Sequence, residues 1–110
     1  MRYYTWYTLD ILEDPDNQVE DFYEEFDEKT GLSFDFLNYN GTEAKWYNWE
    51  SDMKELSEKF PKMMFRLNGT GEEQFDVWNC YFCNGKSHYR EIQTYWEPFD
   101  EKGFYKHNKE

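Results

Sequence analysis

The sequence contains few aliphatic residues: alanine, valine, leucine and isoleucine together number only eleven in 110 residues. Aromatic residues, by contrast, make up 23% of the chain. A core must therefore be built from rings, and this aromatic content excludes a disordered acidic tail. The length fits one domain, which we place at residues 1–98, with residues 99–110 expected to be a loosely held C-terminal tail.

Basic residues are also scarce, with 12 against 24 acidic residues and a formal net charge of −12. Direct binding of nucleic acid needs a basic face, and this balance argues against one. No apolar run approaches the roughly 18 residues of a membrane-spanning helix, and the first residues lack the basic-then-apolar layout of a secretory signal. We therefore expect a cytoplasmic protein that binds neither nucleic acid nor a membrane.

Cysteine and histidine are rare, with two residues of each. Cys80 and Cys83 have the Cys-x-x-Cys spacing, but they fall in a predicted strand, where residues three apart point to opposite faces. That geometry suits neither a redox pair nor a shared metal, although His88 and His107 would complete a Cys₂His₂ zinc set. We therefore expect free structural thiols and neither a metal nor a cofactor. No histidine lies beside a serine or cysteine positioned as a nucleophile, so we also expect no enzymatic activity.

The hydrophobic periodicity predicts an α+β fold of order β-α-β-α-β-β-β. Strands are predicted over residues 3–12, 32–39, 63–67, 74–83 and 86–96, and helices over 15–29 and 49–60. Asp14 is expected to cap the first helix, with Pro15 at its first position. Asn84-Gly85 is the strongest signal for a two-residue hairpin turn. The economical packing is an antiparallel sheet with two helices on one face.

The acidic residues are concentrated in one segment. Between Asp10 and Glu28 there are ten acids and no base, so the other 91 residues are near balance at −2. This segment is either a solvated helix face or a surface for a basic partner. Seven of its acids are candidate contact residues for such a partner: Asp16, Glu20, Asp21, Glu24, Glu25, Asp27 and Glu28.

The predicted hairpin offers a second candidate surface, because both of its faces carry apolar side chains. Trp78, Tyr89 and Tyr95 fall on one face and are candidate contacts for a protein partner or for a second copy in a homodimer. Arg66, Arg90 and Lys86 are the only basic residues grouped near the hairpin. A nucleotide-binding role therefore ranks last among the roles that we consider.

Motifs between residues 43 and 98 form a recognisable series. They are Lys45-Trp46-Tyr47, Asp52-Met53-Lys54-Glu55-Leu56-Ser57, Phe60-Pro61, Gly69-Thr70-Gly71-Glu72-Glu73, Asp76-x-Trp78 and Tyr81-Phe82-x-Asn84-Gly85-Lys86. The series resembles small bacteriophage and mobile-element proteins and, more distantly, a ferredoxin-like domain of the YubB type. The resemblance implies a ferredoxin-like fold and a phage origin, brings no catalytic residue with it, and does not include the acidic segment.

These observations favour a phage-encoded inhibitor that binds a host protein with a basic surface. The expected target is a nucleic-acid-binding defence protein, such as a CRISPR effector or a restriction component, and the expected mechanism is charge mimicry. The alternative is a non-catalytic adaptor whose acidic helix is only solvated and whose partner binds the hairpin aromatics. Salt separates the two, because ionic strength screens exposed charges and leaves an aromatic interface nearly unchanged.

Overall fold

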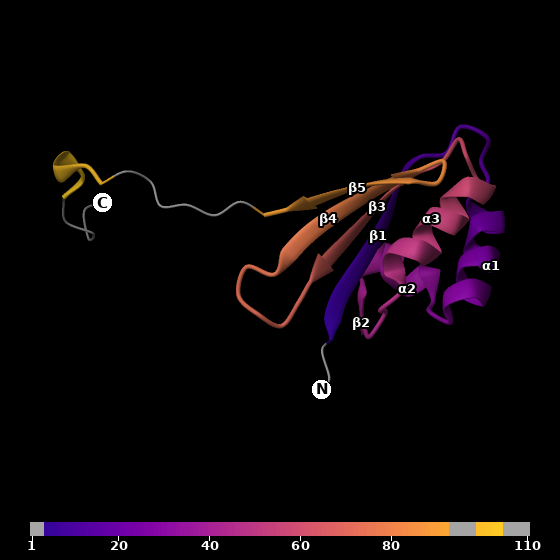
Figure 1. The fold of residues 1–110 in the computed structure, drawn as a ribbon, viewed down its shortest axis with the longest axis horizontal. Coiled ribbons are helices and arrows are strands. Elements are labelled where there is room, and N and C mark those ends of the chain that lie inside the picture. Colours follow the sequence, from indigo (N-terminus) through magenta and orange to yellow (C-terminus); the bar gives the residue numbers. More distant parts are fainter. Residues whose placement is uncertain (1–3, 93–98, 105–110) are drawn as a thin grey trace.

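The computed structural model describes residues 4–92 and 99–104, which form a five-stranded sheet and a layer of helices (Figure 1). The strands are β1 (Thr5–Glu13), β2 (Thr42–Ala44), β3 (Met64–Thr70), β4 (Val77–Cys83) and β5 (Lys86–Glu91). The helices are α1 (Val19–Thr30), α2 (Phe34–Tyr39) and α3 (Trp49–Lys59), with a short 3-10 helix η1 (Glu101–Gly103). All strand pairs are antiparallel, in the order β2-β1-β3-β4-β5. The predicted α+β class and antiparallel sheet are confirmed, whereas this strand order does not confirm the ferredoxin-like arrangement.

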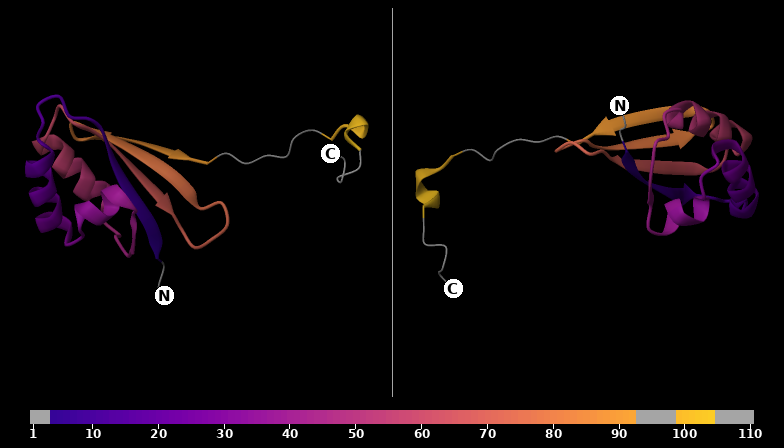
Figure 2. Two further views of the ribbon diagram at one scale, coloured as in Figure 1. Left: turned by 180° about the vertical axis from the view of Figure 1, so that it is seen from behind. Right: turned by 90° about the horizontal axis from the view of Figure 1, so that it is seen from below.

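Helices α1, α2 and α3 lie on the same face of the sheet (Figures 1 and 2). The strands alternate, so Tyr7 and Leu9 of β1 and Phe65 of β3 point toward the helices and are buried. Phe22 of α1 is the centre of the core, with its ring stacked on Phe65 at a centroid distance of 4.5 Å. The expected core of rings is confirmed, and it holds the helix layer and the sheet together.

The prediction of a strand over residues 32–39 is wrong, because residues 34–39 form α2. Phe34 and Leu37 are both buried, and their i, i+3 spacing suits a helix face. The Asp27 carboxylate of α1 accepts a hydrogen bond from the Phe34 backbone N–H at 2.9 Å and satisfies an amide at the start of α2. The second strand follows instead at Thr42–Ala44 and pairs with the beginning of β1.

The predicted start of the first helix at Pro15 is also wrong, because α1 begins at Val19. Asp14 to Asn17 form a turn in which the Asn17 N–H donates to the Asp14 carbonyl, and Asn17 has a φ of +54°. The Asp14 side chain accepts a hydrogen bond from the Gln18 N–H at 2.8 Å. Pro15 therefore occupies the second position of a turn, which its fixed φ also suits. At its other end α1 is capped by Gly31 in the left-handed conformation, with a φ of +75°.

The hairpin of β4 and β5 has the predicted register. Asn84 and Gly85 both have positive φ, as a type I′ turn requires, and Cys83 pairs with Lys86 and Tyr81 with His88. Strand β3 continues beyond its predicted end at residue 67 to Thr70. Trp78 of β4 packs over the bare backbone of Gly69 in this extension. The proposed domain boundary near residue 98 lies outside the described residues. Beyond it, Phe99 and Phe104 contact each other, and both stay exposed.

Candidate functional site

The outward face of α1 carries four acidic residues that form no salt bridge with any residue that the structure describes. These are Glu20, Asp21, Glu24 and Glu28, and all four are exposed. They lie opposite Phe22 and Phe26, which are fully buried. The four carboxylates therefore form a continuous acidic surface at i, i+3 and i+4 spacings, and we call these four residues the α1 acidic face.

The other three predicted contact residues of the acidic segment already have partners in the chain. Glu25 pairs with Lys59 of α3 at 2.9 Å. Asp16 lies in the turn before the helix, 3.6 Å from Lys62. Asp27 is half-buried because its carboxylate is bound to the Phe34 amide. Its expected exposure is wrong, and we remove Asp27 from the candidate contact surface.

The flank of α1 that faces α3 carries paired charges. Lys29 and Glu55 form a salt bridge whose hydrogen bond raises the pKa of Lys29 and lowers the pKa of Glu55. Together with the Glu25–Lys59 pair, it lies along the contact between the two helices. Such exposed pairs contribute little to stability. They do neutralise this flank, so the unpaired negative charge of α1 is confined to its outward face.

The predicted aromatic contact surface on the hairpin is largely buried beneath α3. Trp78 is only 8% exposed, because its ring stacks on Trp49 of α3 at a centroid distance of 4.4 Å. The assignment of Trp78 as a contact residue is therefore wrong. Tyr89 extends the stack, 5.6 Å from Trp78, and remains 43% exposed. Tyr95 lies outside the described residues.

The two cysteines point to opposite faces of β4, as predicted. Cys80 is fully buried under the helices, whereas Cys83 is half-buried on the other face, and both are free thiols. Burial raises the pKa of the Cys80 thiol to about 11, so Cys80 is an un-ionised core residue at neutral pH. Among the described residues, no group of three or more His, Cys, Asp and Glu side chains is placed to hold a metal ion; His107 lies outside them.

This buried thiol predicts a loss of stability in alkaline solution. The unfolded chain ionises Cys80 near its ordinary pKa of 9.0, and the folded chain does so only near 11. The stabilisation is fully present below the lower value and is lost as the pH rises toward the upper one, at a cost of about 2–3 kcal/mol. Urea unfolding at neutral pH and near pH 11 should show a smaller alkaline loss for Cys80→Ala than for the wild type. An equal loss in both would contradict the assignment, and Cys83→Ala is the matched control.

No helix within the described ranges has both the length and the apolar character needed to cross a membrane. A comparison with protein-family models, curated proteins and solved structures finds no match to this chain. The resemblance to phage proteins and to the YubB-type domain therefore stays a prediction.

Proposed function

We propose that this protein is a small phage-encoded inhibitor that binds a basic, nucleic-acid-binding surface of a host defence protein. The observation that carries the proposal is the α1 acidic face, whose four carboxylates are exposed and lie outside the ion pairs of the described chain. Neighbouring like charges repel at i, i+4 spacing. Glu20 and Asp21 lie in the first turn of α1, where negative charge is favourable, but helix stability does not account for Glu24 and Glu28. A role in binding accounts for all four.

The spacing of these charges supports mimicry of nucleic acid. Glu20 to Glu28 span about 12 Å of helix axis at 1.5 Å per residue. Four free carboxylates over that length give about one charge per 3–4 Å, whereas duplex DNA carries one per roughly 1.7 Å. The acidic face is less dense than DNA but of the same order, so it offers a basic channel a similar electrostatic attraction.

The rigidity of the helix supports the proposal as well. Phe22 and Phe26 anchor α1 in the core, and the Glu25–Lys59 and Lys29–Glu55 pairs connect its flank to α3. Charges on an anchored helix are already ordered before binding, which lowers the entropic cost of association. The phage origin and the ferredoxin-like relationship belong to this proposal and come from the sequence resemblance. The anti-defence class of target also belongs to it and is inferred from the acidic helix together with the phage origin.

Replacing the α1 acidic face should abolish partner binding without harming the fold. The variant carries Glu20→Gln, Asp21→Asn, Glu24→Gln and Glu28→Gln, and it keeps Asp27 because that side chain caps α2. The variant removes like-charge repulsion and also the favourable first-turn charges of Glu20 and Asp21, so the free energy of unfolding should change by only a few tenths of a kcal/mol. Loss of long-range steering should slow association with the partner. The measurement is affinity capture from a bacterial lysate at low and high salt, with duplex DNA as competitor.

A control variant with the same change in net charge shows whether binding depends on the α1 acidic face itself or only on the overall negative charge of the protein. Glu13→Gln, Glu43→Gln, Glu73→Gln and Glu101→Gln neutralise four exposed acids on four different parts of the chain. This variant should retain the captured protein, and duplex DNA should displace it. If the α1 variant captures the same protein at full strength and salt has no effect, the adaptor alternative is correct. The remaining candidate contact on the described hairpin would then be Tyr89.

A further inference from the structure

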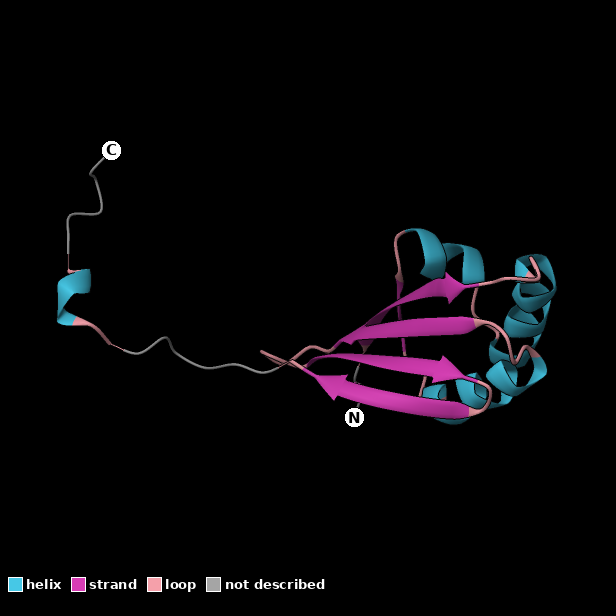
Figure 3. Cartoon of the chain, turned by 90° about the horizontal axis from the view of Figure 1, so that it is seen from above, coloured by secondary structure: helices cyan, strands magenta, loops and turns pink. Residues whose placement is uncertain are grey.

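The face of the sheet opposite the helices is not covered by any part of the chain that the structure describes (Figure 3). Side chains on this outer face alternate with the buried ones, so β4 presents Tyr81 and Cys83 and β3 presents Met64 and Arg66. All four are partly exposed. The outer face is therefore a second surface, separated from the α1 acidic face by the whole thickness of the core.

The hairpin end of the outer face carries positive charge in a strongly negative protein. The hairpin register places Lys86, His88 and Arg90 of β5 on the outer face, and all three are exposed. Arg66 lies on the same face but donates to the Asp10 carboxylate at 2.9 Å, so its charge is already partnered. Lys86 and Arg90 form no salt bridge with the described residues. Unpaired basic side chains on an edge strand protect it from pairing with the edge of another sheet. A further role in binding a ligand requires a hollow beside them.

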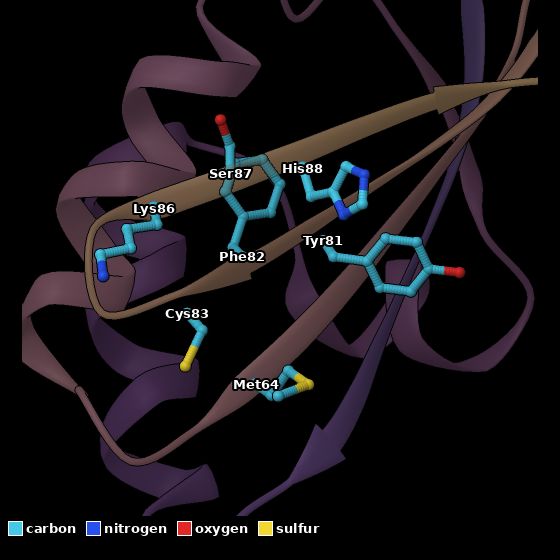
Figure 4. A pocket seen from close by; sticks show the side chains of 7 residues that line it. All are labelled: Met64, Tyr81, Phe82, Cys83, Lys86, Ser87 and His88. Carbon is cyan, nitrogen blue, oxygen red and sulfur yellow. The ribbon is translucent and has the colours of Figure 1, made fainter.

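A hollow of about 300 Å³ opens on this face beside the hairpin turn (Figure 4). Met64, Tyr81 and Cys83 supply a mostly apolar lining, and Lys86 and His88 stand at its edge. The rings of Tyr81 and His88 lie 6.4 Å apart between centroids. A second hollow of about 220 Å³ includes Arg90 and lies farther along the same hairpin. The first hollow therefore combines an aromatic and sulfur-containing surface with a free cation.

We propose that this hollow binds a nucleoside monophosphate, with the base against Tyr81 and Met64 and the phosphate on Lys86. A base has a flat π surface that stacks on aromatic side chains, and a lysine ammonium is a standard phosphate ligand. Lys86 extends toward the hairpin turn, whereas the rings of Tyr81 and His88 lie toward the other end of the hollow (Figure 4). A nucleotide lying along the hairpin therefore reaches both the rings and the ammonium group. An ion without a ring would leave the apolar lining unused, and an uncharged ring would leave Lys86 unused.

The net charge of the protein favours a small anion over a polymer. A nucleic acid strand long enough to pass beyond the hairpin would meet the field of a chain with a net charge of −12. A single nucleotide stays on the outer face, where the α1 acidic face is screened because the Debye length is about 8 Å at physiological ionic strength. This inference is independent of the function proposed for α1, because the two surfaces share no residue.

The test is an NMR titration of the full chain with adenosine monophosphate and uridine monophosphate, each followed through the backbone amides. Adenosine alone, inorganic phosphate and a short single-stranded DNA are the comparison ligands. We expect the nucleotides to shift the amides of Tyr81, Lys86 and His88, and to bind more tightly than adenosine or phosphate. Lys86→Gln should weaken nucleotide binding about tenfold. Lys54→Gln, an exposed lysine on α3, is the matched control and should change nothing.

Three results would overturn the proposal. Nucleotides that leave the hairpin amides unshifted at millimolar concentration would show that β5 carries its cations only to protect the sheet edge. Inorganic phosphate that binds as well as the nucleotides would remove the role of the apolar lining. Single-stranded DNA that binds more tightly than either nucleotide would identify a polymer as the ligand. The α1 variant should bind nucleotides as the wild type does, so the two proposals fail separately.

Discussion

Replacing Phe22 by alanine should destabilise the protein by about 3–5 kcal/mol, as expected for a buried phenylalanine in a close-packed core. Phe22 is fully buried and contacts Phe65, Phe34 and Phe60 at centroid distances of 4.5, 5.4 and 5.6 Å. Removing its ring leaves a cavity at the point where α1, α2, α3 and β3 meet. Because a domain of this size is stabilised by only 5–15 kcal/mol, the loss is a large fraction of the total.

Urea unfolding followed by circular dichroism measures this effect. Phe104→Ala is the matched control, since Phe104 is 75% exposed and should change the free energy of unfolding by about 0.5 kcal/mol or less. A Phe22→Ala cost below about 1 kcal/mol would contradict the burial of this face of α1. The orientation of the α1 acidic face depends on the same helix phase, so it would be contradicted as well.

Gly69→Ala should cost about 1–3 kcal/mol through overpacking, although it adds only one methyl group. A Cβ at this position would lie 2.2 Å from Cζ2 and 2.3 Å from Cε2 of Trp78. The indole has no room to retreat, because its other face stacks on Trp49. The substitution must therefore displace either α3 or the pairing of β3 with β4.

The measurement is again urea unfolding, together with the near-ultraviolet spectrum of the tryptophans. Gly103→Ala serves as the control, because nothing lies within 4 Å of a Cβ placed there. We expect the control to have wild-type stability. A Gly69→Ala protein with unchanged stability and spectrum would mean that Trp78 does not pack over the β3 backbone.

The sequence predicts elements whose signals are local. The i, i+3, i+7 spacing of Val19, Phe22 and Phe26 gives the phase of α1, and Asn84-Gly85 gives the hairpin register. Helix α2 escapes prediction because its first amide is satisfied by Asp27, on another helix. Its six residues are too few for periodicity to separate a helix from a strand.

In the candidate site, too, the sequence predicts what depends on local signals and misses what depends on long-range contacts. The α1 acidic face follows from a helical wheel, because acids opposite a buried stripe must be exposed. Trp78 was misassigned because alternation shows which hairpin residues share a face but not which face the helices cover. The covered face is the one that carries Trp78, because Trp49 of α3, 29 positions earlier in the sequence, stacks on it. The outer-face hollow also depends on long-range pairing, since Met64 and Cys83 come from different strands.

The stack of Trp49 on Trp78 gives the protein an optical signal of its own. Two indoles held face to face couple their electronic transitions, and their near-ultraviolet circular dichroism then depends on their mutual orientation. One indole belongs to α3 and the other to β4, so this signal exists only while the helix layer is seated on the sheet. A denaturation series in which it disappears before the far-ultraviolet helix signal would reveal undocking of the two layers without any attached label.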